Sequence, residues 1–269
     1  MIDIRSIDRI EEMRGVEELQ KEVWGPEDVV PLTHLVAAKE VGAILLGAYD
    51  GELLVGFVYG FVGQEGGSSV IHSHMLAVKP SYRDHHLGYR LKLAQREAAL
   101  SSGFTRVTWT FDPLIARNAA FNLNRLGVRI EDYLVEFYGP MNDGRNLGQA
   151  SDRVWVVWDL TTRHSPIVGS RSTPVLEAAP DGSPRRTAKT PPVDLVRVSI
   201  PSDIEALRRI DPALAERWRY ALREVMTELI GAGWVVASFD RATADYVFAR
   251  ADRQDGRSER IANEQERET

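Results

Sequence analysis

The stretch LAVKPSYRDHHLGYRLKLAQREAAL, residues 76–100, decides the fold class. It opens as an apolar strand, continues through a short polar loop and ends as an amphipathic helix. The apolar stripe of that helix falls at Leu87, Leu91, Ala94 and Ala98. Spacings of three and four residues place these side chains on one helix face. The pattern therefore predicts a strand over 69–78 and a helix over 87–102.

The loop between this strand and this helix has the features of an anion-binding site. The first turn of a helix carries unpaired backbone N–H groups and the positive end of the helix dipole. Arg83 adds a forked cation at the loop entrance, and Gly88 leaves room for a ligand to approach the backbone. We therefore expect a phosphate or pyrophosphate group at the start of the helix.

The distribution of charge agrees with an anionic ligand. Residues 79–129 hold nine basic and three acidic residues, a local charge of +6, whereas the whole chain has a net charge of −6. A local reversal of sign favours one anion-binding place, although a solvated basic helix face would give the same count. No nucleic-acid-binding signature accompanies the basic residues, so we expect no nucleic-acid partner.

The surrounding segments predict an α/β fold with a mixed, mostly antiparallel central sheet flanked by helices. Asp50-Gly51 is a hairpin signal between two apolar runs. A run of strands followed by strand, helix, strand, helix and strand indicates a sheet with helices on its faces. The expected strands are 2–7, 43–49, 52–62, 69–78, 105–111, 129–138 and 153–160, and the expected helices are 9–23, 33–41, 87–102 and 115–126.

Composition excludes several chemistries. The chain has 269 residues, 43% of them hydrophobic, and no cysteine. A disulfide framework, a Cys-ligated metal centre and a cysteine acyl-enzyme are thereby excluded. The first residues are charged from Asp3 onward and no apolar run reaches 18 residues, so we expect no signal peptide, no membrane partner and a cytoplasmic protein.

The second half of the chain predicts a different organisation. Residues 161–192 hold six of the 13 prolines and no aromatic residue, which predicts a linker or long loop after a first domain over 1–160. Residues 251–269 are a polar tail. Between them, residues 193–250 repeat the pattern of the opening strand–helix–helix–strand–strand segment, which predicts a partial second α/β unit.

At the loop of residues 83–88 the sequence resembles a known family, the GNAT acyl-CoA-dependent N-acyltransferases. Their signature is Arg or Gln, two residues, Gly, one residue, then Gly or Ala. Arg83 and Gly88 fit this frame, whereas His86 stands at the place of the first glycine. The phrase Leu76-Ala77-Val78 and the pair Leu126-Gly127 are also similar to the family. The resemblance covers roughly residues 1–160.

The resemblance implies acetyl-CoA or another acyl-CoA as co-substrate and no metal. The main chain of residues 76–78 would pair with the pantetheine arm, the loop amides would hold the pyrophosphate, and Asn118 would contact the thiol end. The implied cofactor-binding residues are Leu76, Ala77, Val78, Arg83, Asp84, His85, His86, Leu87, Gly88, Tyr89 and Asn118. Relatives often carry a tyrosine as general acid where this chain has Leu123, so that acid is missing.

Two histidines are candidates for the base that takes the proton from an amine. His72 and His74 lie two residues apart on one strand and so on one face, next to the expected acyl group, with His74 nearer to Leu76. Imidazole titrates near neutrality, which suits a general base. Hydrogen-bonded sheet residues are the alternative. As a metal pair they lack a third ligand at a telling spacing.

Asp112 and Arg117 follow a predicted central strand, at the edge where ligands bind in open sheets. Arg117 would hold a carboxylate on the acceptor. Asp112 is equally explained as a residue that ends a strand before a helix. These observations predict acyl transfer from CoA to a small amine, an amino acid among the candidates, by direct attack in a ternary complex. A non-catalytic CoA-binding sensing or interaction module is the alternative, and the oligomeric state is not predicted.

Overall fold

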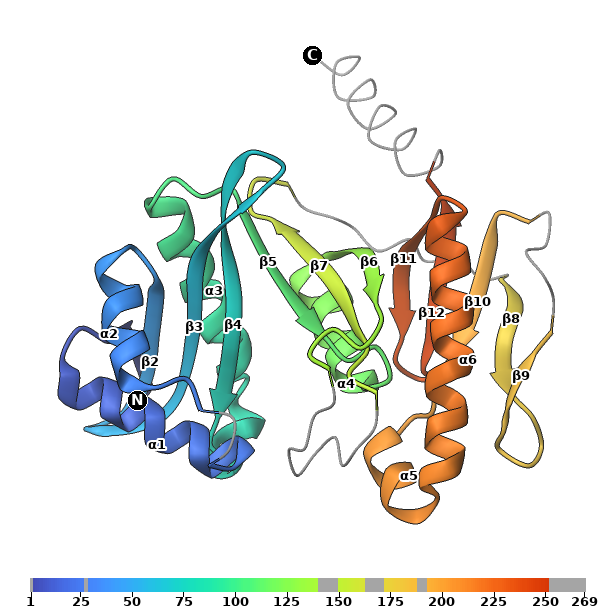
Figure 1. Ribbon diagram of the computed structural model, residues 1–269, viewed down its shortest axis with the longest axis horizontal. Helices are drawn as coiled ribbons and strands as arrows, with labels where there is room; N and C mark the ends of the chain where they lie inside the picture. Colours follow the sequence, from blue (N-terminus) through green and yellow to red (C-terminus); the bar gives the residue numbers. More distant parts are fainter. Residues whose placement is uncertain (1, 27–28, 140–149, 163–171, 188–192, 252–269) are drawn as a thin grey trace. The chain divides into compact units, whose positions relative to one another are not determined.

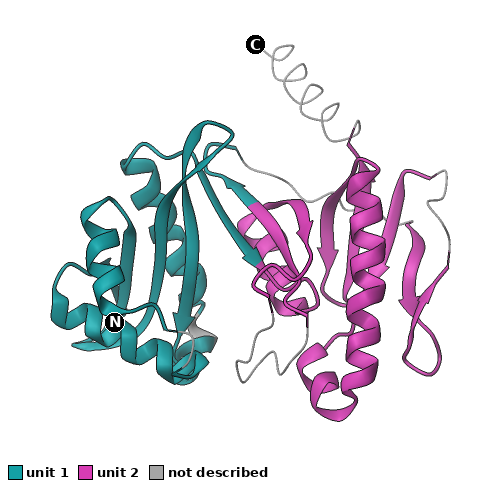
Figure 2. Ribbon diagram, in the orientation of Figure 1, with its two compact units in different colours: residues 1–110, 140–149, 157–163 teal, residues 111–139, 150–156, 164–269 magenta. Residues whose placement is uncertain are grey.

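The computed structural model describes residues 2–26, 29–139, 150–162, 172–187 and 193–251 (Figure 1). The chain divides into two compact units (Figure 2). Unit 1 comprises residues 1–110, 140–149 and 157–163, and unit 2 comprises residues 111–139, 150–156 and 164–269. The division passes through strands β5 (Arg106–Phe111) and β7 (Arg153–Asp159). Each unit is described by itself.

Unit 1 is built on a mixed, mostly antiparallel sheet, which confirms the predicted fold class. Strands β1 (Ile2–Ser6), β2 (Ile44–Asp50), β3 (Leu53–Glu65) and β4 (Ser68–Val78) are neighbours in that order and antiparallel. Strand β5 follows β4 in the sheet and runs parallel to it.

Helices cover both faces of this sheet. Helices α1 (Ile10–Trp24) and α2 (Leu32–Glu40) pack on one face, and α3 (Leu87–Ser101) packs on the other (Figure 1). Successive residues of β3 alternate between the faces: Phe57 and Tyr59 belong to the α1/α2 core, and Val58 belongs to the α3 core. The alternation of apolar residues therefore gives the sheet two buried sides.

A β-bulge interrupts the pairing of β3 with β4. Tyr59 pairs with Met75, but Gly60 pairs with Ser73, so His74 is the extra residue on β4. Gly60 opposes the bulge in a space too small for a side chain, because a Cβ atom there would lie 2.8 Å from Ile71 Cγ2 and 3.0 Å from the His72 carbonyl oxygen. The bulge turns His74 outward in the middle of a buried sheet.

Unit 2 contains a second sheet, in the order β11-β12-β10-β8-β9. Its long helix α6 (Pro212–Gly231) begins with Asp211 as N-cap and a proline in its first turn. The bounds of the other elements in this unit are α4 (Ala116–Ala119), a π-helical segment (Ala120–Leu126), β6 (Arg129–Leu134), β8 (Thr173–Ala178), β9 (Pro184–Arg186), β10 (Leu195–Ser199), α5 (Ile204–Ile210), β11 (Trp234–Asp240) and β12 (Asp245–Arg250).

Two segments differ from the sequence-based expectation. The helix expected over 115–126 is one short α-helix followed by the π-helical segment. Strands β8 and β9 lie inside residues 161–192, where a linker or long loop was expected. Val175 and Leu176 are buried in the second sheet, and Pro174 and Pro184 stand at or near strand starts, where the sheet tolerates proline. The predicted partition into domains stays a prediction, and most of the predicted tail lies outside the described residues.

The element order of the opening segment recurs in unit 2, whereas the strand pairing does not. The order β10, α5, α6, β11, β12 matches β1, α1, α2, β2, β3. However, β1 pairs with β2, the first strand of its hairpin, whereas β10 pairs with β12, the second strand of the corresponding hairpin. Similar local sequence has therefore produced similar elements in a different sheet order.

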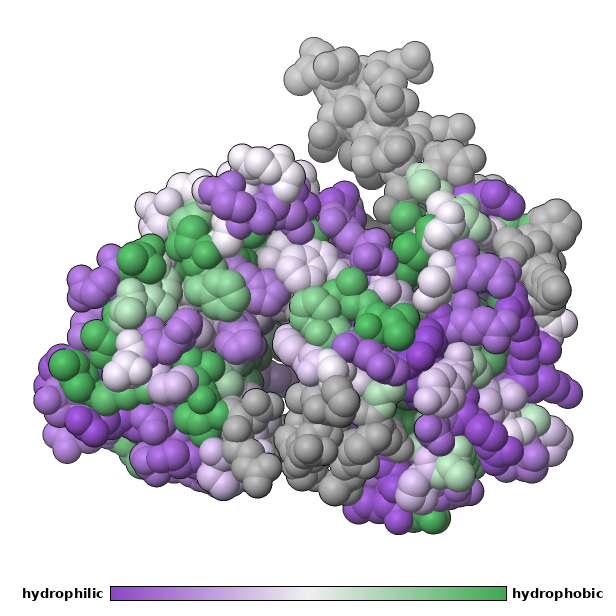
Figure 3. All heavy atoms as spheres, viewed as in Figure 1, coloured by the Kyte–Doolittle hydropathy of each residue, from purple (hydrophilic) through white to green (hydrophobic). Residues whose placement is uncertain are grey.

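Within the described ranges, the structure has no helix that is both long and apolar enough to cross a membrane. The longest helix, α6, is amphipathic: it buries Trp218, Leu222 and Leu229, and hydrophilic side chains predominate along its outward side (Figure 3). Its apolar face packs within unit 2.

Candidate functional site

Strands β4 and β5 pair only at their beginnings. The register consists of Ile71 with Val107 and His72 with Thr108, and the two strands separate beyond these pairs (Figure 1). From Ser73 to Val78, β4 is therefore hydrogen-bonded to β3 along one edge, while no residue of β5 pairs with the other edge. An exposed strand edge offers backbone donors and acceptors to an extended ligand. Leu76, Ala77 and Val78 lie in this unpaired stretch.

The loop after β4 leads into an uncapped helix. Residues Pro80–His85 form a 3₁₀ turn, and α3 begins at Leu87. No described side chain caps the start of α3, and its first turn has no acidic residue. The N–H groups of that turn and the helix dipole are thus suited to an anion, as the sequence predicted.

His86 has a left-handed backbone conformation, with φ 53° and ψ 22°. Few residues other than glycine adopt it readily, although histidine does so more often than most. The family signature places a glycine here, and the positive φ explains why. Gly88 has an ordinary φ, and a Cβ atom added there would meet only the Leu76 side chain at 3.7 Å.

The other predicted loop residues surround this helix start. Arg83 is exposed and donates from Nε to the Val78 carbonyl oxygen at 3.3 Å, so it lies against the end of β4. Leu87 is buried in the α3 core, and Tyr89 is half-buried. The side chains of Asp84 and His85 lie outside the described structure, although their backbone belongs to the 3₁₀ turn.

His72 and His74 lie on one side of the sheet, because the rings of both pack against Phe61 at 5.3 and 5.8 Å between centroids. His72 is half-buried and its Nδ1 lies 3.1 Å from Thr108 Oγ1. Burial, reinforced by the nearby charges of His74 and Lys92, lowers the pKa of His72 to about 4. His74, the bulge residue, is exposed. The two histidines therefore differ in their access to a ligand.

Two residues absent from the sequence-based prediction extend this histidine cluster. His34 Nε2 lies 2.9 Å from the Tyr59 hydroxyl, and the Tyr59 ring packs edge-on against His74 at 6.2 Å. Burial raises the pKa of Tyr59 to about 12. The two residues are 25 positions apart on different elements, so no local pattern connects them. The alternation along β3 gave the only sequence signal, since it places Tyr59 and Phe61 on one face.

Lys92 was counted among the basic residues available to an anion, but it is buried. Its side chain lies on the α3 side of the sheet, with Nζ 2.7 Å from Ser73 Oγ, 3.2 Å from Gln95 Oε1 and 3.7 Å from the centre of the Trp109 ring. It is only 3% exposed and pairs with no described carboxylate. Burial lowers its pKa to about 7.

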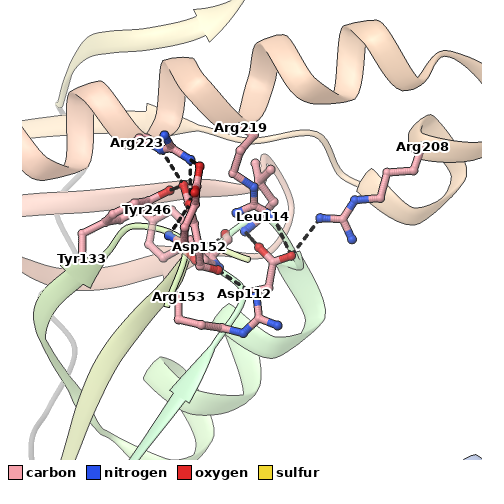
Figure 4. Close-up of polar contacts among 11 residues, drawn as sticks. Asp112, Leu114, Tyr133, Asp152, Arg153, Arg208, Arg219, Arg223 and Tyr246 are labelled. Carbon is pink, nitrogen blue, oxygen red and sulfur yellow. Dashed lines mark hydrogen bonds and ion pairs between the residues drawn. The ribbon is translucent and has the colours of Figure 1, made fainter. Parts of the chain in front are cut away.

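Asp112, Arg117 and Asn118 belong to unit 2. Asp112 is buried and accepts from Arg208, from Arg219 and from the Leu114 amide (Figure 4). Burial alone would raise the pKa of Asp112, but the arginine charges outweigh it and hold this pKa below its usual range. Arg117 is exposed and paired with Glu205, and Asn118 is half-buried on α4. The expected roles of these three residues toward an acceptor and a cofactor stay predictions.

Comparison with known proteins agrees with this geometry. Residues 8–127 match the model of the acetyltransferase (GNAT) family. The ribosomal-protein-S18-alanine N-acetyltransferase from Escherichia coli is 12% identical and has a TM-score of 0.50, over 63% of this chain and all of that chain. An acetyltransferase of the GNAT family from Streptococcus pneumoniae is 15% identical, with a TM-score of 0.47 over 58% of this chain and 98% of that chain.

An aminoglycoside 6'-N-acetyltransferase solved with coenzyme A is 19% identical, with a TM-score of 0.46 over 61% of this chain and 99% of that chain. No curated protein matches the sequence. The likeness to the Escherichia coli enzyme shows the fold alone, so the assignment to a family rests on the family model together with the signature loop. Residues 8–127 of this chain therefore match the acetyltransferase (GNAT) family, a family of acyltransferases.

Proposed function

We propose that this chain transfers an acyl group from acyl-CoA to a small amine. The observation that carries this proposal is the unpaired edge of β4 from Ser73 to Val78, which ends beside the uncapped start of α3. An extended amide-containing arm and a pyrophosphate together match this pair of features.

In this proposal the cofactor is held mainly by backbone. The main chain of Leu76, Ala77 and Val78 pairs with the pantetheine arm, and the amides of residues 84–89 hold the pyrophosphate. Arg83 supplies the fixed positive charge, because its exposed guanidinium is tied through Nε to the end of β4. Asn118 is proposed to contact the thiol end. Acetyl-CoA is the simplest donor, and a longer acyl group such as succinyl fits the same chemistry.

The chemical step is a direct aminolysis. The amine nitrogen attacks the thioester carbonyl carbon, the C–S bond breaks, CoA leaves as the thiolate and the ammonium proton passes to a base. We assign the base to His74, because it is exposed, whereas His72 is half-buried with Nδ1 beside Thr108. Leu123 is buried and supplies no acid, so the thiolate leaves without protonation by that position. The chain has no cysteine to carry the acyl group.

A CoA-binding module without catalysis is the second candidate, and one experiment separates the two. The protein is incubated with acetyl-CoA or succinyl-CoA and a panel of small amines that includes amino acids, and free thiol is measured. Amine-dependent thiol release supports transfer, and initial-rate lines that intersect support a ternary complex. CoA binding in calorimetry without thiol release for any amine would favour the binding module. Absence of CoA binding would refute both functions.

A further inference from the structure

Two buried arginines of unit 2 share a single carboxylate. Arg219 Nη2 lies 2.7 Å and Arg208 Nη2 lies 2.8 Å from Asp112 Oδ2, while Oδ1 accepts from the Leu114 amide at 2.9 Å (Figure 4). The side chains of Arg219, Arg208 and Asp112 are only 1%, 8% and 5% exposed. Asp112 thus pairs with both arginines away from water.

The other carboxylate of this cluster, Asp152, makes its hydrogen bonds with residues other than Arg219. Asp152 is fully buried, and Arg223 donates to it through Nε at 2.9 Å and Nη2 at 2.8 Å. The Tyr133 hydroxyl and the Glu136 amide donate to the same two oxygens. A bidentate arginine already neutralises this carboxylate.

Arg219 has hydrogen-bond donors without acceptors. Its Nε and Nη1 atoms are buried and have no hydrogen-bond partner in the described structure, which leaves three N–H bonds unused. Burial would lower the pKa of Arg219, but the charge of Asp112 outweighs this effect and raises the pKa, so the group stays charged. Buried donors without acceptors are unfavourable, and a bound anion would accept hydrogen bonds from them.

We propose that Arg219, assisted by Arg208, binds a small carboxylate anion within unit 2. A carboxylate offers two coplanar acceptor oxygens, which suit the planar guanidinium. The two neighbouring hydroxyls are not free to donate to the anion. Tyr133 donates to Asp152, and Tyr246 donates to the Pro113 carbonyl oxygen at 2.7 Å. The arginines are therefore the proposed donors. This proposal does not depend on the proposed acyl transfer. The bound carboxylate can belong to the amine that accepts the acyl group or to a molecule without an amine.

The test measures binding without CoA, so its failure would leave the acyl-transfer proposal standing. Sodium acetate, sodium succinate and alanine are each titrated into the full chain by calorimetry and by urea denaturation, at an ionic strength held constant with sodium chloride. We expect a saturable heat and a saturable rise in the urea midpoint with at least one of the three. Alanine alone would identify an amine-bearing ligand, whereas acetate or succinate would show that no amine is needed.

Substitutions at Arg219 test whether this side chain binds the anion. Arg219→Met should weaken binding by at least about tenfold. If this variant does not fold, Arg219→Lys serves as the test, because it keeps the charge but loses the forked guanidinium and should also weaken binding. Arg217→Met is the matched control, because Arg217 lies two residues away on the same helix and is exposed. No saturable effect beyond sodium chloride, or equal binding in both Arg219 variants and the wild type, would overturn the proposal.

Discussion

Replacing Lys92 with methionine should change how the stability of the protein depends on pH. Lys92 is 3% exposed, and the hydrogen-bond partners of its ammonium group, Ser73 and Gln95, are neutral. Methionine has a similar length and suits an apolar site. Ser73 keeps its own hydrogen bond to Gln95 Oε1 at 2.9 Å, so the substitution leaves no buried hydroxyl without a partner. We therefore expect the variant to fold.

The expected magnitude follows from the pKa of Lys92, which burial lowers from 10.5 to about 7. Between these two pH values the unfolded chain binds a proton that the folded chain lacks, so the free energy of unfolding rises with pH. The full gain is roughly 5 kcal/mol, at about 1.4 kcal/mol for each pKa unit. Between pH 6 and 9 the same linkage gives about 2.7 kcal/mol. The penalty for the buried charge is thus present below pH 7 and is relieved above it.

The assay is urea denaturation of both proteins at pH 6, 7, 8 and 9. The other titrating groups are common to both proteins, so the difference in their unfolding free energies isolates Lys92. From pH 6 to pH 9, the free energy of unfolding of the wild type should rise by about 2.7 kcal/mol relative to that of Lys92→Met. Lys21→Met is the control: ion pairs with Glu18 and Glu17 raise the pKa of this surface lysine, so both of its states are protonated up to pH 9 and the difference should stay flat.

A difference between wild type and Lys92→Met that does not change with pH would refute this reasoning. It would mean that the ammonium keeps its ordinary pKa in the folded chain through solvation at the α3–β4 contact. An acidic partner that raised the pKa of Lys92 would give the same flat difference, because both states would then stay protonated up to pH 9.

Three further predictions concern the loop and the histidines. His86→Gly should raise the free energy of unfolding by about 1 kcal/mol in urea denaturation, because glycine adopts the positive φ without strain; a loss of stability would contradict the left-handed conformation. Gly88→Val should lower CoA affinity in calorimetry by more than about tenfold with an unchanged circular dichroism spectrum, since a branched side chain would cover the first-turn amides; Gly88→Ala is the milder control, and unchanged affinity in Gly88→Val would refute the loop assignment. In rate profiles from pH 4 to 9, the acidic limb should vanish in His74→Ala and persist in His72→Ala, because the pKa of His72 is about 4; a limb that persists in both variants would exclude His74 as the base.

The sequence by itself determined the local features of the site. Leu87 and Leu91 of the predicted apolar stripe are buried, but the buried face of α3 continues through Gln95 and Ala99 and not through Ala94 and Ala98 as the stripe predicted. The polar loop before the stripe correctly marked where that helix begins. Arg83 and Gly88 predict a phosphate site at this helix start. Each of these conclusions depends on residues within a few positions of one another, and local spacing carries that information because backbone geometry sets the helical and strand periods.

Only the tertiary structure decided which distant groups meet. The bulge at His74 depends on Gly60 of the neighbouring strand, and the contact of Tyr59 with His34 joins a strand to a helix. A count of charges along the sequence treats Lys92 like any other cation, but packing buries its ammonium group against the Trp109 ring. Asp112 meets Arg219 across 107 residues of sequence. In the same way, a proline-rich segment contains strand β8, whose Val175 and Leu176 are buried in the second sheet. Burial and ion pairing depend on which residues lie close in space. The spacing of residues along the chain does not specify these contacts when the residues are tens of positions apart.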